Sequence, residues 1–93
     1  MTKNKNPIRI AGSWTLAVLP YYQGGKTYYY IVGLHKKGFY SFFGYFESVR
    51  AANLKLSVLD PYDAQRSSHL DYGHTGKIKI PKYLSADGKE TEI

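Results

Sequence analysis

The 93-residue chain contains no cysteine, no long apolar run and no acidic residue before Glu47. Without cysteine there can be no disulfide, no zinc–thiolate or iron–sulfur site and no cysteine nucleophile. The apolar runs are too short to cross a bilayer and no leader-like segment opens the chain, so we expect a cytoplasmic protein without a membrane partner. Hydrophobic residues make up 43% of the chain and charged residues 22%, a composition typical of a folded domain.

The missing acidic residues make the charge uneven along the sequence. The net charge of +6 lies entirely in the half before Glu47, and the remaining residues sum to zero. The same half is rich in aromatic residues, and it holds Tyr21, Tyr22, Tyr28, Tyr29 and Tyr30. A basic, aromatic half indicates a polyanionic partner, although the solubility of a small domain also accounts for a charge of this size.

Three segments with strand composition follow one another and predict an antiparallel meander. Residues 14–19 alternate, with Trp14, Leu16 and Val18 on one face and Thr15, Ala17 and Leu19 on the other. Residues 27–34 and residues 39–46 are aromatic or apolar on both faces. Because a half-exposed sheet would alternate, the second face must be covered by the rest of the chain, by a second copy or by a ligand.

Glycine and proline mark the turns and irregularities of this meander. Gly24 and Gly25 supply the positive φ that a tight hairpin turn requires. Gly44 lies inside the third segment and predicts a bulge or a sharp bend. Pro20 either ends the first strand or places it at a sheet edge.

The segment from Glu47 to Leu59 fits two secondary structures. Residues 47–53 have the composition of a short helix, and Leu54, Leu56 and Val58 then alternate as in a strand. A single helix over residues 48–59 fits the same spacing. We expect the short helix followed by a strand, with the single helix as the alternative.

These elements predict a mainly β fold of five to six short strands with one short helix near residues 47–53. We expect a small antiparallel barrel of the SH3-like or OB-like kind, and an open sheet with a helix packed on it is the alternative. Residues 1–7 are expected to form a flexible basic arm, residues 8–84 a single domain and residues 85–93 a polar tail. So small a domain buries little surface alone, which leaves a homodimer open.

The alternation of each strand predicts which side chains form the core and which face solvent. The expected core residues are Trp14, Leu16, Val18, Leu54, Leu56, Val58, Ile78 and Ile80. In residues 27–34 the inward set is Tyr28, Tyr30, Val32 and Leu34, which leaves Tyr29 and Ile31 outside. Tyr40 and Phe42 are expected to face outward in the next strand. The predicted binding residues are Lys26, Tyr29, Lys36, Lys37, Tyr40, Phe42, Lys55, Lys77 and Lys79.

Polar residues 62–76 form the longest segment with loop composition. They include His69, Asp71 and His74, but the spacing of these residues matches no closed metal motif. No nucleophile–base pair or carboxylate pair can be assigned either. We therefore expect no catalytic residue, no metal site and no cofactor.

Two functions of different classes fit these features. The first is binding of single-stranded nucleic acid, with Tyr29, Tyr40 and Phe42 stacking on bases and the lysines contacting phosphates. The alternative is a small inhibitor or adaptor of the phage or mobile-element type, such as an anti-defence protein. It would dock on an acidic host protein or on a nucleoprotein complex through its exposed aromatic residues.

Overall fold

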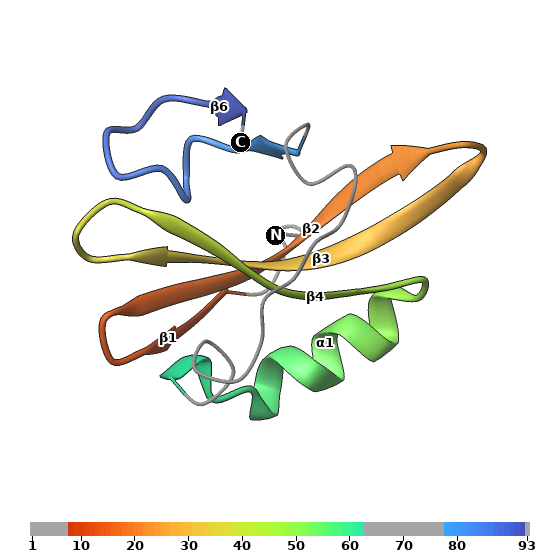
Figure 1. Cartoon of the computed structure of the whole chain (residues 1–93), viewed down its shortest axis with the longest axis horizontal. Coiled ribbons are helices and arrows are strands. Elements are labelled where there is room, and N and C mark those ends of the chain that lie inside the picture. Colours follow the sequence, from red (N-terminus) through yellow and green to blue (C-terminus); the bar gives the residue numbers. More distant parts are fainter. Residues whose placement is uncertain (1–7, 63–77, 93) are drawn as a thin grey trace, which may run out of the picture.

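A four-stranded antiparallel meander forms the centre of the molecule, in the order β1-β2-β3-β4. The computed structural model describes residues 8–62 and 78–92, shown in Figure 1. The elements are β1 (Ile8–Ala11), β2 (Trp14–Gln23), β3 (Lys26–His35), β4 (Tyr40–Phe46), α1 (Val49–Val58), β5 (Lys79–Ile80) and β6 (Thr91–Glu92). The predicted arm (residues 1–7) and most of the predicted loop (residues 62–76) lie outside the described residues.

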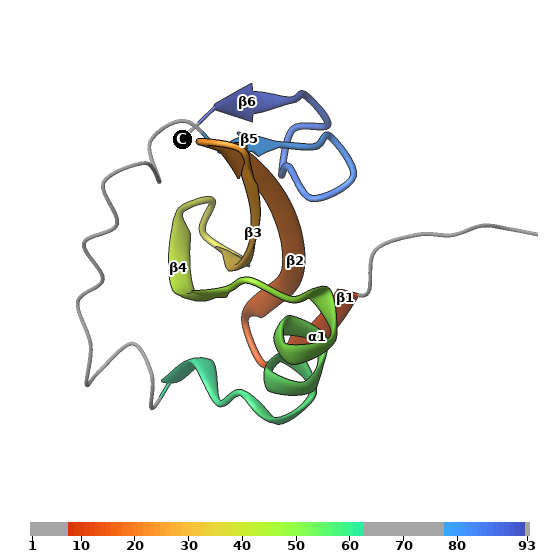
Figure 2. The same cartoon turned by 90° about the vertical axis from the view of Figure 1, so that its right-hand side faces the viewer.

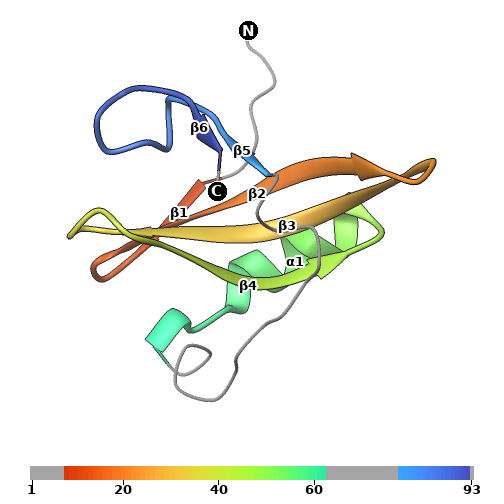
Figure 3. The same ribbon diagram turned by 45° about the horizontal axis from the view of Figure 1, so that its top comes forward.

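The meander is an open sheet and is not closed into a barrel. The mainly β class is therefore confirmed, whereas the arrangement follows the alternative of an open sheet with one packed helix. The physical reason lies in residues 49–58, which form α1 and cover one face of the sheet instead of adding a strand that could close it. The β2–β3 hairpin extends beyond its neighbours at one end of the sheet (Figure 3).

The single helix α1 replaces the short helix and the strand expected over residues 47–59. Ser48 caps its N-terminus, because the Ser48 side chain accepts a hydrogen bond from the backbone N–H of Ala51 at 3.2 Å. At the other end the Arg9 guanidinium donates hydrogen bonds to the carbonyl oxygens of Leu56 and Leu59. Arg9 thus places a positive charge at the negative end of the helix dipole.

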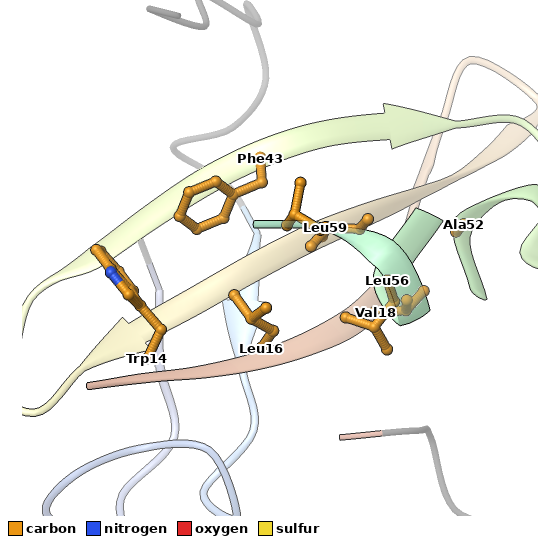
Figure 4. Packing of buried hydrophobic residues seen from close by; sticks show 8 residues of the cluster. Trp14, Leu16, Val18, Phe43, Ala52, Leu56 and Leu59 are labelled. Carbon is orange, nitrogen blue, oxygen red and sulfur yellow. The ribbon is translucent and has the colours of Figure 1, made fainter. Parts of the chain in front are cut away.

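The face of the sheet toward α1 carries the first hydrophobic core, here called the helix-side core. Its buried members are Trp14, Leu16, Val18, Ile31, Phe43, Ala52, Leu56 and Leu59 (Figure 4). Gly33 allows this packing, because a Cβ there would lie 2.7–2.9 Å from side-chain atoms of Phe43, Leu16 and Trp14. The three large side chains therefore meet over a position that only glycine can occupy without displacement.

The opposite face carries a second core, here called the hairpin-side core. Its buried members are Ala17, Leu19, Tyr30, Val32, Ile78, Ile80 and Leu84. The residues after position 77 cover this face of the sheet. Because β6 pairs with β5, residues 79–92 form a hairpin, which includes most of the residues predicted as a polar tail. In Figure 2, α1 and the β5–β6 hairpin lie on opposite sides of the sheet. The chain itself therefore covers both faces of the aromatic strands.

Several expected positions change with this arrangement. Leu54 and Val58 were expected in the core but are 64% and 72% exposed, because the helical period turns them away from Leu56. Ile31 was expected outside and is fully buried under α1. Ile78 and Ile80 are buried as expected, but on the opposite face of the sheet from Trp14.

The predicted turns and irregularities are confirmed. Gly24 and Gly25 have φ values of +64° and +80° in the turn between β2 and β3. The β3–β4 register shifts between Tyr30 and Val32, and Gly44 in the facing part of β4 has a φ of +123°. Pro20 lies within β2, beyond the part that pairs with β1, which is an edge position. Among the described residues, α1 is too short and too polar to span a bilayer.

Candidate nucleic-acid interface

The three aromatic residues predicted to stack on bases do not share a face of the sheet. Tyr29 is partly buried against the helix-side core, on the side that α1 covers. Tyr40 and Phe42 are partly buried against the hairpin-side core, on the other side. One strand of nucleic acid could therefore not stack on all three rings at once.

The strand register instead gathers a different aromatic set on the hairpin side. Tyr21 pairs with Tyr28, Tyr30 pairs with Tyr45, and the partners of Tyr40 and Phe42 are Leu34 and Val32. We call this set the aromatic face, and its members are Tyr21, Tyr28, Tyr30, Tyr40, Phe42 and Tyr45. Three neighbouring strands contribute to it, because alternate residues of paired strands point to the same side.

The bulge at Gly44 places Tyr45 on this face. In a regular strand Phe42 and Tyr45 would point to opposite sides, since they are three residues apart. The register shift beside Gly44 adds one residue, so Phe42 packs toward Tyr30 and Tyr45 does the same. Phe43 then lies in the helix-side core. One glycine therefore determines which β4 rings reach the aromatic face.

The rings of the aromatic face pack mainly edge to face. Tyr28 and Tyr45 have centroids 5.6 Å apart with their planes at 86°, and Tyr30 meets Phe42 at 5.9 Å and 76°. Tyr30 is completely buried, whereas Tyr45 is 40% exposed. The face thus has a fixed interior ring and a solvent-accessible ring at its β4 side.

A groove of about 250 Å³ lies at the β2 side of the aromatic face. We call it the Tyr83 groove, and its lining residues are Leu19, Pro20, Lys79, Pro81, Tyr83 and Glu90. Tyr83 is 52% exposed, and Lys79, one of the predicted phosphate contacts, is exposed beside it. Leu19 pairs with Tyr30, and Tyr30 pairs with Tyr45, so the groove and Tyr45 lie at the two ends of one row across the sheet.

The predicted lysines are distributed over several parts of the molecule. Lys26 forms an exposed ion pair with Glu47, with Nζ and Oε1 3.2 Å apart, so this acid reduces its attraction for phosphate. Lys36 and Lys37 are exposed in the β3–β4 turn, and Lys55 is exposed on α1. Lys77 lies outside the described residues. Of the predicted cations that the structure describes, Lys79 lines the Tyr83 groove.

A second groove of about 170 Å³ borders Tyr40, but it is unsuited to phosphate because its lining residues include a carboxylate and no cation. Asp87 contributes to its lining together with Gly38, Ser85, Ala86 and Thr91. A hydrogen bond from Ser85 Oγ at 2.6 Å and another from the backbone N–H of Lys89 lower the pKa of Asp87. The carboxylate is therefore charged at neutral pH and repels an anion beside Tyr40.

Sequence reasoning missed Tyr21, Tyr28, Tyr45 and Tyr83 as candidate binding residues. A signal for the first two was present, because a two-residue Gly-Gly turn fixes the pairing of Tyr21 with Tyr28. The position of Tyr45 depends on the bulge, and that of Tyr83 depends on the return of residues 78–92 to the sheet. Neither of these can be obtained from local periodicity.

Among residues 8–62 and 78–92, no three His, Asp or Glu side chains gather as metal ligands would. His69, Asp71 and His74 lie outside these ranges. Comparison of the chain with protein-family models, with curated proteins and with solved structures finds no match. The arguments for function therefore rest on the surfaces described above.

Proposed function

We propose that the protein binds single-stranded nucleic acid at the two exposed margins of the aromatic face, which are the Tyr83 groove and Tyr45. The observation that carries the proposal is the row Leu19–Tyr30–Tyr45. Its first two side chains are buried, and they hold an exposed groove at one end and an exposed aromatic ring at the other on one side of the sheet. Unpaired bases stack on such rings without regard to sequence.

The chemistry of the Tyr83 groove suits one nucleotide of such a strand. Tyr83 and Pro81 offer flat apolar surfaces for a base, and Lys79 offers a cation for the adjoining phosphate. The Glu90 carboxylate accepts hydrogen bonds, as a base with an exocyclic amino group would require. The groove therefore favours an unpaired base over a duplex, whose base faces are covered by stacking.

The distribution of lysines indicates how strongly binding should depend on salt concentration. Each phosphate contact to a single strand lowers the logarithm of affinity by about 0.7 per logarithmic unit of salt. Lys79 is the predicted cation in the groove, and Glu47 offsets Lys26, so few contacts are expected. We expect a shallow salt dependence and an affinity that comes mainly from stacking.

The proposal is tested by fluorescence anisotropy with labelled single strands of about twelve nucleotides, a length typical of small β-sheet binding sites. Tyr45→Leu and Tyr83→Leu should each weaken binding by about 5- to 150-fold, which is the loss of one stacked base. Tyr22→Leu is the matched control, because Tyr22 is 69% exposed but lies outside the aromatic face.

Tyr45→Phe and Tyr83→Phe keep a ring at each position and should retain most of the affinity. Thermal melting of every variant separates lost binding from lost folding. Absence of binding by the wild-type protein, or equal losses from the Tyr22 and Tyr45 variants, would contradict the proposal.

A further inference from the structure

The outer side of α1 carries an apolar stripe that belongs to neither core. Leu54 and Val58 are one helical turn apart and are 64% and 72% exposed. Ala51, three residues before Leu54, extends the stripe toward the N-terminus of the helix. Ala52 and Leu56 point the other way and are buried against the sheet. We call Ala51, Leu54 and Val58 the α1 stripe.

This stripe departs from the pattern of a surface helix, whose outer face is normally polar. It is flanked by Arg50 and Lys55, and α1 contains no acidic residue. In Figure 2 the helix lies at the lower side of the molecule, with the strands of the sheet above it. The exposed surface of α1 is therefore apolar along its centre and basic at its sides.

Charge and size both argue against a second copy of the chain as the occupant. Two α1 helices facing each other would bring Arg50 and Lys55 of both copies together without an acidic residue on either helix. A ten-residue helix is about 15 Å long, too short to supply alone the roughly 1,200 Å² of a stable interface. A surface that wraps around the helix buries more area and can supply the missing negative charge.

We infer that α1 docks on another protein, in an apolar groove with acidic rims. Leu54 and Val58 enter the groove, and Arg50 and Lys55 face the acidic side chains at its edges. The capping contacts of Ser48 and Arg9 hold α1 as a helix in the unbound protein, so docking requires little additional ordering.

The α1 stripe and the aromatic face lie on opposite sides of the sheet. Protein docking and nucleic-acid binding therefore use different surfaces of the molecule. Failure of one does not bear on the other.

The test is site-specific photo-crosslinking with the full chain. A Leu54→p-benzoylphenylalanine variant is irradiated in nuclease-treated lysate of the native cells. A Tyr22→p-benzoylphenylalanine variant is the control, because Tyr22 is similarly exposed but lies outside the α1 stripe. We expect one adduct at position 54 only, with a cross-linked peptide that is apolar and richer in Asp and Glu than in Lys and Arg.

Competition with protein that lacks the crosslinker measures how much the α1 stripe contributes to binding. The wild-type protein should abolish the adduct, whereas a Leu54→Ser, Val58→Ser double variant should compete about tenfold less well or worse. Both positions are exposed, so the double variant is expected to stay folded, and its melting curve checks this. An adduct with a second copy, with lipid or with a basic peptide, or no adduct at all, would overturn the inference.

Discussion

Replacing Leu56 by alanine should destabilise the protein far more than replacing Leu54 by alanine. The two residues are identical and only two positions apart, so the comparison isolates the burial that the helical period produces. Leu56 is 3% exposed and belongs to the helix-side core, whereas Leu54 is 64% exposed. If residues 54–58 formed a strand, both side chains would share one face and their losses would be similar.

The expected magnitudes follow from these exposures. Leu56→Ala removes buried methyl groups and leaves a cavity, for a loss of about 2–5 kcal/mol in the free energy of unfolding. For a domain of this size, a loss of about 2 kcal/mol lowers the Tm by roughly 8–16 °C. Only about a third of Leu54 is buried, so Leu54→Ala should lower the free energy of unfolding by about 0.5 kcal/mol.

Urea denaturation followed by tryptophan fluorescence provides the assay, because Trp14 is the only tryptophan and lies in the same core as Leu56. The slope of the transition should stay the same in both variants, so that midpoints compare stability directly. Equal shifts of the two midpoints, or a larger shift for Leu54→Ala, would refute the helical assignment of this segment.

Three further predictions concern single positions. Gly33→Ala should lower the free energy of unfolding by about 1–3 kcal/mol in urea, because the new methyl group collides with three core side chains. Arg9→Gln should remove the charge at the C-terminus of α1, which costs about 1–2 kcal/mol and speeds amide exchange in the last helical turn. In an NMR titration, Asp87 should have a pKa below 3.8, and Ser85→Ala should raise it. Since that pKa is lowered in the folded state, the stabilisation is complete above pH 3.8 and is lost as the pH falls through the folded pKa.

The meander could be predicted from the sequence because its signals are local. The alternation of Trp14, Leu16 and Val18, the Gly24-Gly25 turn and the glycine within β4 each depend on neighbouring residues. Local pattern also showed that both faces of β3 and β4 need cover. It could not show that α1 covers one face and that residues 78–84 cover the other.

The error over residues 54–59 has a definite physical cause. Leu54, Leu56 and Val58 satisfy a period of two, while Ala52, Leu56 and Leu59 satisfy a helical period. Contacts from distant residues decide between the two periods, because Arg9 caps the helix and Val18 and Ile31 receive its buried side chains. Such contacts are separated by up to fifty residues and leave no local trace.

The structure groups other residues together than the sequence pattern did. The basic, aromatic half of the sequence forms β2, β3 and β4, but Tyr29 lies on the side of α1 and Tyr40 and Phe42 lie on the other side. Strand alternation divides the side chains between the two faces of the sheet. Which face is covered by α1 and which by residues 78–84 depends on the tertiary packing. The bulge at Gly44 then changes the alternation within β4, so local pattern alone does not place Tyr45.

Burial distinguishes the aromatic residues whose replacement would disturb folding from those whose replacement can test binding. The ring of Tyr30 is buried in the hairpin-side core, and the ring of Phe42 packs against it. Their presence is explained by packing, so losses from their replacement would report on folding. Tyr45 and Tyr83 keep large exposed areas, as do Leu54 and Val58 on the other side of the sheet. Substitutions at these four positions therefore measure binding with the least interference from stability.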